Sequence, residues 1–354
     1  MEQVYLGIDV GNSFSTVVAL NEEQEPTYME QIPTLDVAKW IELVGLFEGC
    51  EIHAAFEIGT HYGWLSELLN KYCVRVEVVN AEAFAVISKS TKKTDSIDAV
   101  KLAQGLWRGD LPTVTVPNER IRQDRRLVAH MHHHSNNISR AKILIRSILL
   151  RARLECPHTN VMGAAAQEWL TTFAMPKLEA QEQMFLRMLM EQLTLLLKQS
   201  SEMNAGVPAR MEAYPEAPIV QSIPGFGPLV SLALLSIIAG IGRFKTPGEL
   251  ASYLGLCGSV DQSGQSLRQG SITRRGSSHV RWLLAQAITH LIRKDPKAKR
   301  RYEKLRRKKK AKVARVAMMR WLVTVLWRML NNQEKYRLDG KKGNYFKRKS
   351  GKAA

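Results

Sequence analysis

The first 108 residues alternate between short apolar runs and amphipathic stretches. The apolar runs have the length and β-branched content of buried strands, and polar turn residues at 21–26 separate the second run from the third. The predicted strands cover residues 4–10, 14–20, 27–32, 51–56 and 74–79. The predicted helices cover residues 35–47, 62–72, 81–87 and 94–107, the last with Thr94 as its N-cap. Strands that come first in series and then alternate with helices indicate an α/β layer with helical crossovers.

The rest of the chain has a helical period. Residues 118–154 predict one long amphipathic helix and residues 177–203 a second, a pattern typical of a helical hairpin or coiled coil that pairs with another copy. Prolines at 208, 215 and 218 indicate a linker. Beyond it, a turn at 223–228 resembles a helix-hairpin-helix loop, whose backbone N–H groups can hold a phosphate. Further helices are predicted from residue 229 onward and at 247–254, 278–293 and 312–331, with a Gly/Ser loop at 255–270.

These patterns predict an α/β domain followed by mostly helical ones. We place the domains at 1–115, 116–215 and 216–332, with a basic tail at 333–354 that we expect to be disordered unless bound. The start of the chain has no basic, apolar signal segment, and no apolar run is long enough to span a membrane. Four cysteines without a C-x-x-C pair argue against a disulfide scaffold and a Cys-based zinc site. We therefore expect a protein of the reducing cytoplasm.

Charge is unevenly distributed along the 354 residues. The whole chain has a formal net charge of +18, yet residues 1–115 hold 8 basic and 17 acidic side chains, and the remainder holds 43 basic and 16 acidic ones. A strongly basic region suggests a polyanionic partner. The acidic region suggests a site rich in carboxylates.

Four carboxylates form the first candidate site. Asp9 ends the first predicted strand, Glu57 follows the fourth, and Asp95 and Asp98 lie three apart on one helix face. Clustered carboxylates repel one another unless cations bind, and hard oxygen ligands suit Mg²⁺ or Mn²⁺. Two such ions can assist phosphoryl transfer. The alternative is that they are ordinary surface carboxylates.

The run from Gly7 to Asn12 is compatible with two classes of protein. It resembles the first strand of ribonuclease-H-type nucleases, including Holliday-junction resolvases, and also the first phosphate loop of actin-like ATPases and sugar kinases. Those kinases need a second phosphate loop and an adenosine motif downstream. Neither is present, nor is a P-loop motif.

Serines and arginines in the Gly/Ser region form a second candidate site. A serine hydroxyl attacks phosphate only when it is deprotonated and the phosphate charge is offset, which arginine guanidinium groups can do. The serines are Ser259, Ser263, Ser266 and Ser271, and the arginines are Arg268, Arg274, Arg275 and Arg281. The alternative is a flexible linker with solubilising serines.

Basic side chains elsewhere predict contacts with nucleic-acid phosphates. Such contacts are salt-dependent and read no sequence. The candidates are Arg120, Arg125, Arg126 and Arg140 on the long helix, and a basic run at 297–320 that includes Lys308, Lys309 and Lys310. We interpret Trp282, Trp321 and Trp327 as core packing. The histidines at 130–134 are interpreted as a helix surface rather than a metal site.

Several motifs in a fixed order carry a resemblance to one family. The N-terminal ones are 7–12, 56–63 and Lys93-Thr94-Asp95-Ser96-Ile97-Asp98-Ala99. The C-terminal ones are 222–228, 244–256, Ser263-Gly264 and 270–276. Together they closely resemble the DEDD transposases of the IS one-ten / IS eleven-eleven insertion-sequence family, over nearly the whole chain.

The resemblance implies a RuvC-like N-terminal domain of the ribonuclease-H fold, a coiled coil that mediates dimerisation, and a C-terminal transposase domain. It implies that Asp9, Glu57, Asp95 and Asp98 hold Mg²⁺ or Mn²⁺, and that Ser263 attacks a DNA phosphate to give a phosphoserine intermediate. The implied partners are target and donor DNA, a noncoding bridge RNA, and further copies of the chain in a dimer or a tetramer. The implied location is the bacterial cytoplasm, in association with the nucleoid.

The sequence departs from the family pattern around the serine. Gly258 stands where relatives often have proline, and Gln262 replaces a serine before Ser263, so Ser266 and Ser259 are alternative nucleophiles. Three other functions stay open at this point. They are a metal-dependent, Holliday-junction resolvase-like nuclease that uses water, a nucleic-acid-binding protein with an inactive ribonuclease-H fold, and an actin-like kinase.

Overall fold

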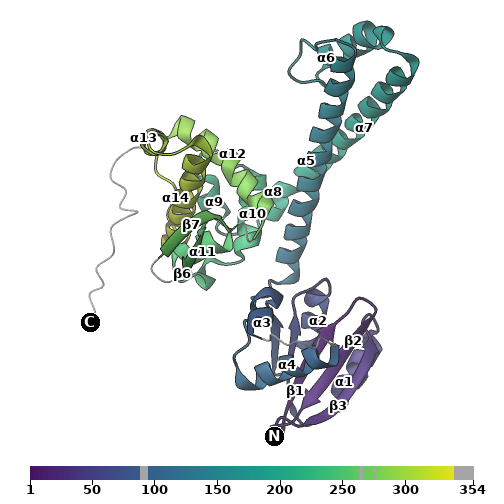
Figure 1. Cartoon of the computed structure of the whole chain (residues 1–354), viewed down its shortest axis with the longest axis vertical. Helices are drawn as coiled ribbons and strands as arrows, with labels where there is room; N and C mark the ends of the chain where they lie inside the picture. The colour runs from purple at the N-terminus through teal and green to yellow at the C-terminus, as the bar shows by residue number, and fades with distance from the viewer. Residues whose placement is uncertain (88–94, 264–265, 274–275, 339–354) are drawn as a thin grey trace. The chain divides into compact units, whose positions relative to one another are not determined.

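The computed structural model describes residues 1–87, 95–263, 266–273 and 276–338. The chain divides into two compact units, residues 1–119 and 120–354 (Figure 1). The domain boundaries expected at 115, 215 and 332 stay predictions, and the residues 339–354 of the expected tail lie outside the described ranges, as does Thr94. No helix in the described ranges is both long and apolar enough to cross a membrane.

The first unit is a five-stranded mixed sheet with helices on both faces. Its strand order is β3-β2-β1-β4-β5, with β2 antiparallel to β1 and β3, and with β4 parallel to β1 and β5. The strands are β1 (Gln3–Val10), β2 (Phe14–Leu20), β3 (Pro26–Pro33), β4 (Glu51–Glu57) and β5 (Arg75–Val79). The helices are α1 (Val37–Gly45), α2 (Tyr62–Leu69), α3 (Ala81–Ile87) and α4 (Asp95–Arg108). All nine predicted elements are confirmed, and the arrangement fits a ribonuclease-H-like fold.

Alternate residues of β1 face opposite layers of helices. Val4, Leu6 and Ile8 pack in a core shared with α1 and α2, and the opposite face packs against α3 and α4. Gly7 lies on the α4 side, where a Cβ would come within 1.9 Å of the Ala99 carbonyl oxygen and 2.5 Å of the Ala103 nitrogen. Since only a residue without a side chain fits there, Gly7 sets how closely α4 approaches the sheet.

We expect Gly7→Ala to lower the free energy of unfolding of the first unit by about 1–3 kcal/mol, because the methyl group must push the α4 backbone away. Gly45→Ala is the matched control. Gly45 is exposed at the end of α1 with nothing within 4 Å of a built Cβ, so the helix should tolerate alanine or gain slightly. Urea unfolding of both variants measures the difference, and equal stability of the two would contradict the close-packing argument.

The second unit begins with a long helical hairpin. Helix α5 (Glu119–Arg151) packs against α7 (Ala180–Ala205) through a core that includes Ile145, Leu149, Leu186 and Leu193. The Arg151 guanidinium also bonds the Glu182 carboxylate at 2.9 and 3.1 Å. Between the two helices lie α6 (Ala164–Trp169), a π-helical turn (Leu170–Ala174) and a 3-10 turn (Met175–Lys177). The two predicted long helices are confirmed within a few residues at each end.

A helical bundle follows and shares α5 with the hairpin, since Val128 and Met131 lie in the bundle core. Its helices are α8 (Val207–Met211), α9 (Ala217–Gln221), α10 (Pro228–Ile238), α11 (Pro247–Tyr253), α12 (Ser278–Lys294), α13 (Pro296–Arg306) and α14 (Ala311–Asn332). The sequence did not predict α13. The linker prediction was wrong at α8 and α9, where Pro208 and Pro218 occupy the first turn of a helix, a position that proline suits.

The predicted Gly/Ser loop is instead an antiparallel β-hairpin. Strands β6 (Gly258–Ser263) and β7 (Ser266–Ile272) pair from Gly258↔Ile272 to Ser263↔Ser266. The glycine and serine content favoured a loop, but two residues beginning with glycine between strand-like runs are also the sequence signature of a tight hairpin. The flexible-linker interpretation of these serines is therefore wrong for the described backbone.

A buried carboxylate fixes α5 to α8 and the segment that follows α8. Asp124 is 1% exposed, and its two oxygens accept bonds from Arg210 and Tyr214, both at 2.7 Å. Arg120 lies 3.6 Å from the same carboxylate and 4.4 Å above the Tyr214 ring. Burial, reinforced by the bond to Asp124, raises the pKa of the Tyr214 hydroxyl, so it stays a donor at neutral pH.

Candidate functional site

Asp9 and Glu57 lie side by side at the ends of two parallel strands. Ile8 pairs with Phe56, and each carboxylate follows one residue later on neighbouring strands β1 and β4. Asp9 is two residues beyond Gly7, so both are on the α4 side of β1. The carboxyl ends of parallel strands therefore place two acidic side chains at one edge of the sheet, as their sequence positions predicted.

Helix α4 begins at the same edge. Its middle, at Ala99 and Ala103, lies over Gly7, and near its end the Trp107 indole donates to the Glu22 carbonyl at 3.0 Å. Glu22 is at the opposite edge, where its side chain accepts a bond from the Gln3 nitrogen. Helix α4 thus runs antiparallel to β1, and its first turn lies toward Asp9.

That first turn carries Asp95 and Asp98. They precede the buried Ala99 and Leu102 by one turn each, so they continue the helix face that packs on the sheet. Asp98 forms an ion pair with Lys101 at 3.3 Å. The fold brings all four predicted carboxylates to one edge and one face of the sheet.

The four carboxylates have the donor chemistry for Mg²⁺ or Mn²⁺, because hard cations prefer oxygen ligands. Within the described ranges, however, no three Asp, Glu, His or Cys side chains lie close enough to hold a metal ion. Mutual repulsion keeps carboxylates apart unless a cation offsets their charge. The chemistry of the set therefore fits such an ion, although the side chains do not form a closed ligand shell.

The candidate serines lie on the β6–β7 hairpin. Ser263 is the last residue of β6 and pairs with Ser266, the first residue of β7, while Ser259 and Ser271 lie nearer the other end. Arg268 is in β7. Arg274 and Arg275 lie outside the described residues. The hairpin belongs to the second unit and the acidic edge to the first.

Three arginines predicted to contact nucleic acid have bonding partners within the protein. Arg120 contacts Asp124 and Tyr214, and Arg125 donates to the carbonyl oxygens of Ser236 and Ile237 at 2.8 and 3.0 Å, at the end of α10. Arg281 donates to two carbonyl oxygens beside the hairpin. Each guanidinium group has a structural task that the sequence pattern did not predict. Arg126 and Arg140 are exposed on α5.

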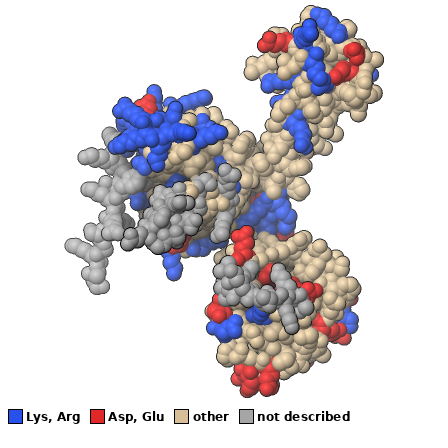
Figure 2. Space-filling view, in the orientation of Figure 1, with Lys and Arg blue, Asp and Glu red and all other residues tan. Residues whose placement is uncertain are grey.

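The largest concentration of positive charge is on α13 and its connection to α14. Residues 297–320 contain thirteen Lys or Arg and one acidic residue. Helix α13 turns Ala298, Tyr302 and Leu305 toward the bundle core, which leaves its cations outside, and Lys308, Lys309 and Lys310 are all exposed. We call residues 297–310 the basic platform. Figure 2 shows these Lys and Arg side chains gathered over α13.

Three aromatic rings join α5 to the start of α12. The three rings form a triangle, with centroid distances of 4.0 Å between His279 and His132 and of 5.9 Å from Trp282 to each histidine. Trp282 is 45% exposed, so the core-packing interpretation is wrong for it, whereas Trp321 and Trp327 do pack against the bundle core. In the histidine run at 130–134, His134 Nε2 lies 2.6 Å from the Leu196 carbonyl oxygen of α7, which fits a structural interpretation.

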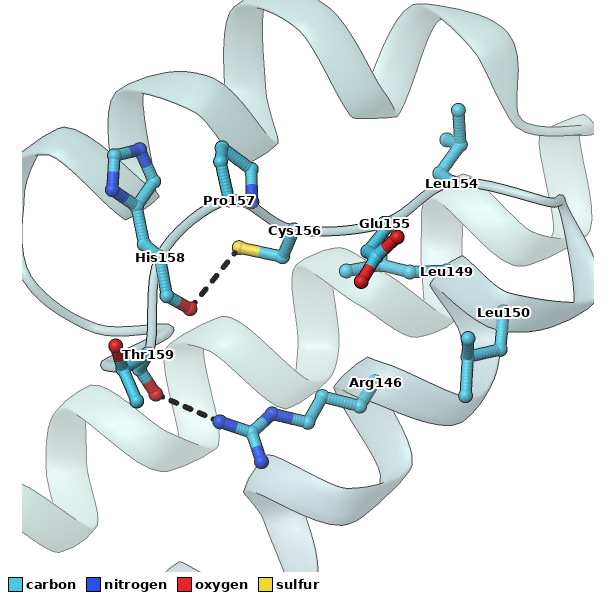
Figure 3. Close-up of a pocket in the computed structure, with 9 residues that line it drawn as sticks. All are labelled: Arg146, Leu149, Leu150, Leu154, Glu155, Cys156, Pro157, His158 and Thr159. Atoms are coloured by element: carbon cyan, nitrogen blue, oxygen red, sulfur yellow. Dashed lines mark hydrogen bonds between the residues drawn. The ribbon is translucent and has the colours of Figure 1, made fainter.

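An open pocket of about 320 Å³, which the sequence did not predict, lies at the tip of the helical hairpin of α5 and α7, beside the segment that follows α5. Arg146 donates to the Thr159 carbonyl oxygen at 2.7 Å, and the Cys156 thiol is 3.6 Å from the His158 carbonyl oxygen (Figure 3). The first bond joins the segment after α5 back to α5, and the second lies within that segment. The polar groups are thus used in holding the loop.

An acidic edge on a ribonuclease-H-like sheet, with a strongly basic helical unit in the same chain, is typical of proteins that process nucleic acids. Two family models match the chain in agreement with this. A DEDD transposase model of the IS110 type matches residues 6–153, and the model for the transposase IS116/IS110/IS902 family matches residues 217–303. Together they cover about two thirds of the residues. Both halves of the chain are thus similar to insertion-sequence transposases of this type.

Individual relatives are distant. An insertion element IS110 uncharacterized 43.6 kDa protein of Streptomyces coelicolor is 28% identical over 40% of this chain and 35% of its own length. A probable family 20 transposase of Pseudomonas aeruginosa is 25% identical over 43% of this chain and 46% of its own. The transposase for insertion sequence element IS1111A of Coxiella burnetii is 30% identical over 33% of this chain and 34% of its own. The matched segments span less than half of each relative.

The ring cluster generates a prediction about pH. His279 is 7% exposed, and burial, with a smaller contribution from neighbouring His132, lowers its pKa from 6.5 to about 4. Between these values the unfolded chain takes up a proton that the folded chain does not, so stability falls as the pH decreases from about 6.5 to 4.

We expect this group to account for a loss on the order of 2 kcal/mol across that interval. His279→Phe keeps a ring in place and removes the titration, so its unfolding free energy should fall less between pH 7.5 and 4.5 than that of the wild type. Urea unfolding at the two pH values measures both losses. Parallel losses in the two proteins would show that His279 is not the responsible group.

Proposed function

We propose that the protein is an insertion-sequence transposase that cuts and rejoins DNA through a phosphoserine intermediate. The observation that carries the proposal is the placement of Asp9, Glu57, Asp95 and Asp98 at one edge of the sheet, in a chain that also carries a serine hairpin within the second unit. The match of both halves to transposase family models supports it.

The proposed chemistry is a transesterification. The Ser263 hydroxyl loses its proton and forms a bond from Oγ to phosphorus, while the bond from phosphorus to one deoxyribose oxygen breaks and that oxygen is protonated. Bound Mg²⁺ or Mn²⁺ would lower the cost of deprotonating the hydroxyl and offset the phosphate charge. The four carboxylates would hold the ion. Rejoining is the reverse step with a different deoxyribose hydroxyl, so no external energy source is needed.

The proposed partners are target and donor DNA and a noncoding bridge RNA that selects the sites by base pairing. The basic platform supports binding of phosphate backbones of either kind. Further copies of the chain are also proposed, as a dimer or as a tetramer made of two dimers. The exposed side chains of Leu144, Phe185 and Met188 on the hairpin of α5 and α7 support pairing, because they line an apolar groove of about 460 Å³.

A metal-dependent nuclease of the Holliday-junction resolvase type is the second candidate. The acidic edge alone favours it, since water could replace the serine as nucleophile with the same carboxylates. The hairpin serines would then be structural. The two candidates differ in whether a covalent protein–DNA species forms.

The first test is trapping of that species. We expect wild-type protein, with Mg²⁺, its flanking noncoding RNA and DNA carrying the element junction, to give a denaturant-stable adduct that protease removes. Ser263→Ala and Asp9→Asn should each reduce it by at least about 100-fold, because one removes the nucleophile and the other a metal-holding charge.

Ser271→Ala, in the other strand of the hairpin, is the matched control and should keep the adduct. Ser266→Ala and Ser259→Ala examine the alternative nucleophiles. Strand cleavage that leaves no adduct and survives Ser263→Ala would instead establish the nuclease.

The second test concerns the basic platform. Replacing Lys308, Lys309 and Lys310 with glutamine should weaken nucleic-acid binding about tenfold or more and reduce the slope of log affinity against log salt by about 2–3, since up to three phosphate contacts are lost. The control replaces Lys39, Lys71 and Arg75 of the first unit with glutamine, an equal change of charge. Filter binding over a salt series compares the two. Equal weakening would mean that net charge matters rather than the platform.

A further inference from the structure

The end of the β6–β7 hairpin remote from Ser263 is closed by a specific set of bonds. The strand ladder ends at Gly258↔Ile272, and beyond it the Thr273 nitrogen donates to the Cys257 carbonyl oxygen at 2.9 Å. We call this end, residues 254–258, 272–273 and 276, the hairpin base. An isolated two-stranded hairpin is marginally stable in water, so its direction depends on how its base is held.

One guanidinium group joins both sides of the hairpin base. Arg281, in the first turns of α12, donates from Nη1 to the Gly276 carbonyl oxygen at 3.0 Å and to the Leu254 carbonyl oxygen at 3.4 Å. Leu254 precedes β6 and Gly276 follows β7. The fixed geometry of a guanidinium suits two acceptors at once, which a single ammonium group satisfies less well.

Gly276 completes the junction through close packing. Its φ is +81°, and a Cβ there would come within 2.2 Å of the Tyr253 carbonyl oxygen at the end of α11. Both the backbone conformation and the available space exclude a side chain. The backbone at Gly276, just before α12, is therefore packed directly against the end of α11, the helix that leads into the hairpin.

Both helices that support the hairpin base are themselves fixed. Tyr253 and Phe244 lie at 4.4 and 4.5 Å from the Arg243 guanidinium, which packs over both rings. Helix α12 is capped by the Ser277 hydroxyl, which accepts a bond from the Val280 nitrogen at 3.2 Å. Leu250 of α11 and Leu284 of α12 lie in the bundle core. The hairpin base is thus connected to two helices that pack in the bundle core.

We propose that Arg281 is a positioning residue that holds the hairpin in the orientation needed for reaction, in place of the nucleic-acid contact that its charge suggested. The inference rests on the proposed reaction of Ser263. The five residue-to-residue steps of β6 from Gly258 to Ser263, at about 3.3 Å each, place Ser263 about 17 Å from the base, so a tilt of about 10° there moves the serine by about 3 Å. Displacement of a reacting group by 1 Å can already cost about 100-fold in rate.

The experiment measures three quantities for Arg281→Ala and Arg281→Lys. They are the single-turnover rate of adduct formation at saturating DNA, the DNA dissociation constant, and the rate at which a maleimide labels Cys257, a half-buried thiol within the hairpin base. Labelling uses a background in which Cys50 and Cys156 are serine, because burial raises the pKa of the remaining Cys73 thiol to about 12 and keeps it unreactive. Arg293→Ala, an exposed cation further along α12, is the matched control.

We expect Arg281→Ala to slow adduct formation about 100-fold, to change the dissociation constant less than twofold, and to speed labelling of Cys257 at least fivefold. Arg281→Lys should recover part of both the rate and the protection, and Arg293→Ala should resemble the wild type. Thermal unfolding followed by circular dichroism shows whether the Arg281→Ala protein remains folded. The same measurement on Arg281→Lys examines a smaller change of the side chain.

A weaker dissociation constant with unchanged labelling of Cys257 would overturn the proposal and make Arg281 a nucleic-acid contact. An unchanged rate and unchanged labelling would overturn it as well. If Ser263→Ala keeps the adduct, the proposed function fails instead, and the labelling rates still decide separately whether Arg281 holds the hairpin base.

Discussion

The absence of a side chain at Gly7 determines the geometry of the acidic edge. Helix α4 contacts the β1 backbone there so closely that a methyl group would collide with the Ala99 carbonyl oxygen. This contact fixes the height of the helix above the sheet, and its antiparallel direction then brings Asp95 and Asp98 to the edge where Asp9 and Glu57 end their strands. A backbone contact two residues from the first carboxylate thus controls the distance between the two halves of the set.

In the second unit, the roles of the arginines divide according to their surroundings. Those facing helix ends or the hairpin base, such as Arg125 and Arg281, satisfy carbonyl oxygens that would otherwise lack partners. Those on α13 have few acidic neighbours, because Asp295, the acidic residue at the start of the helix, is buried and caps it. Positive charge available to a polyanion is therefore concentrated on the basic platform.

Much of the fold could be predicted from periodicity, and the reasons for the failures are specific. Strands such as β1 and β4 and helices such as α5 have strong patterns of apolar residues. The β6–β7 hairpin was missed because its glycines and serines have low strand propensity, and α13 because cations obscure its narrow stripe of Ala298, Tyr302 and Leu305. The position of the acidic edge could be predicted because Asp9 and Glu57 stand at the ends of predicted strands. The roles of Arg125 and Arg281, in contrast, depend on carbonyl acceptors that no sequence pattern identifies.

Helix α5 belongs to two cores at once. Met131 packs in the bundle and Ala141 in the helical hairpin, and a single uninterrupted helix joins them. Adding or removing one residue between these positions would rotate the hairpin by about 100° around the α5 axis and shift it by about 1.5 Å. The ten-residue spacing between Met131 and Ala141 therefore determines the rotation of the helical hairpin about the α5 axis. It specifies the direction in which the apolar face of that hairpin points from the bundle.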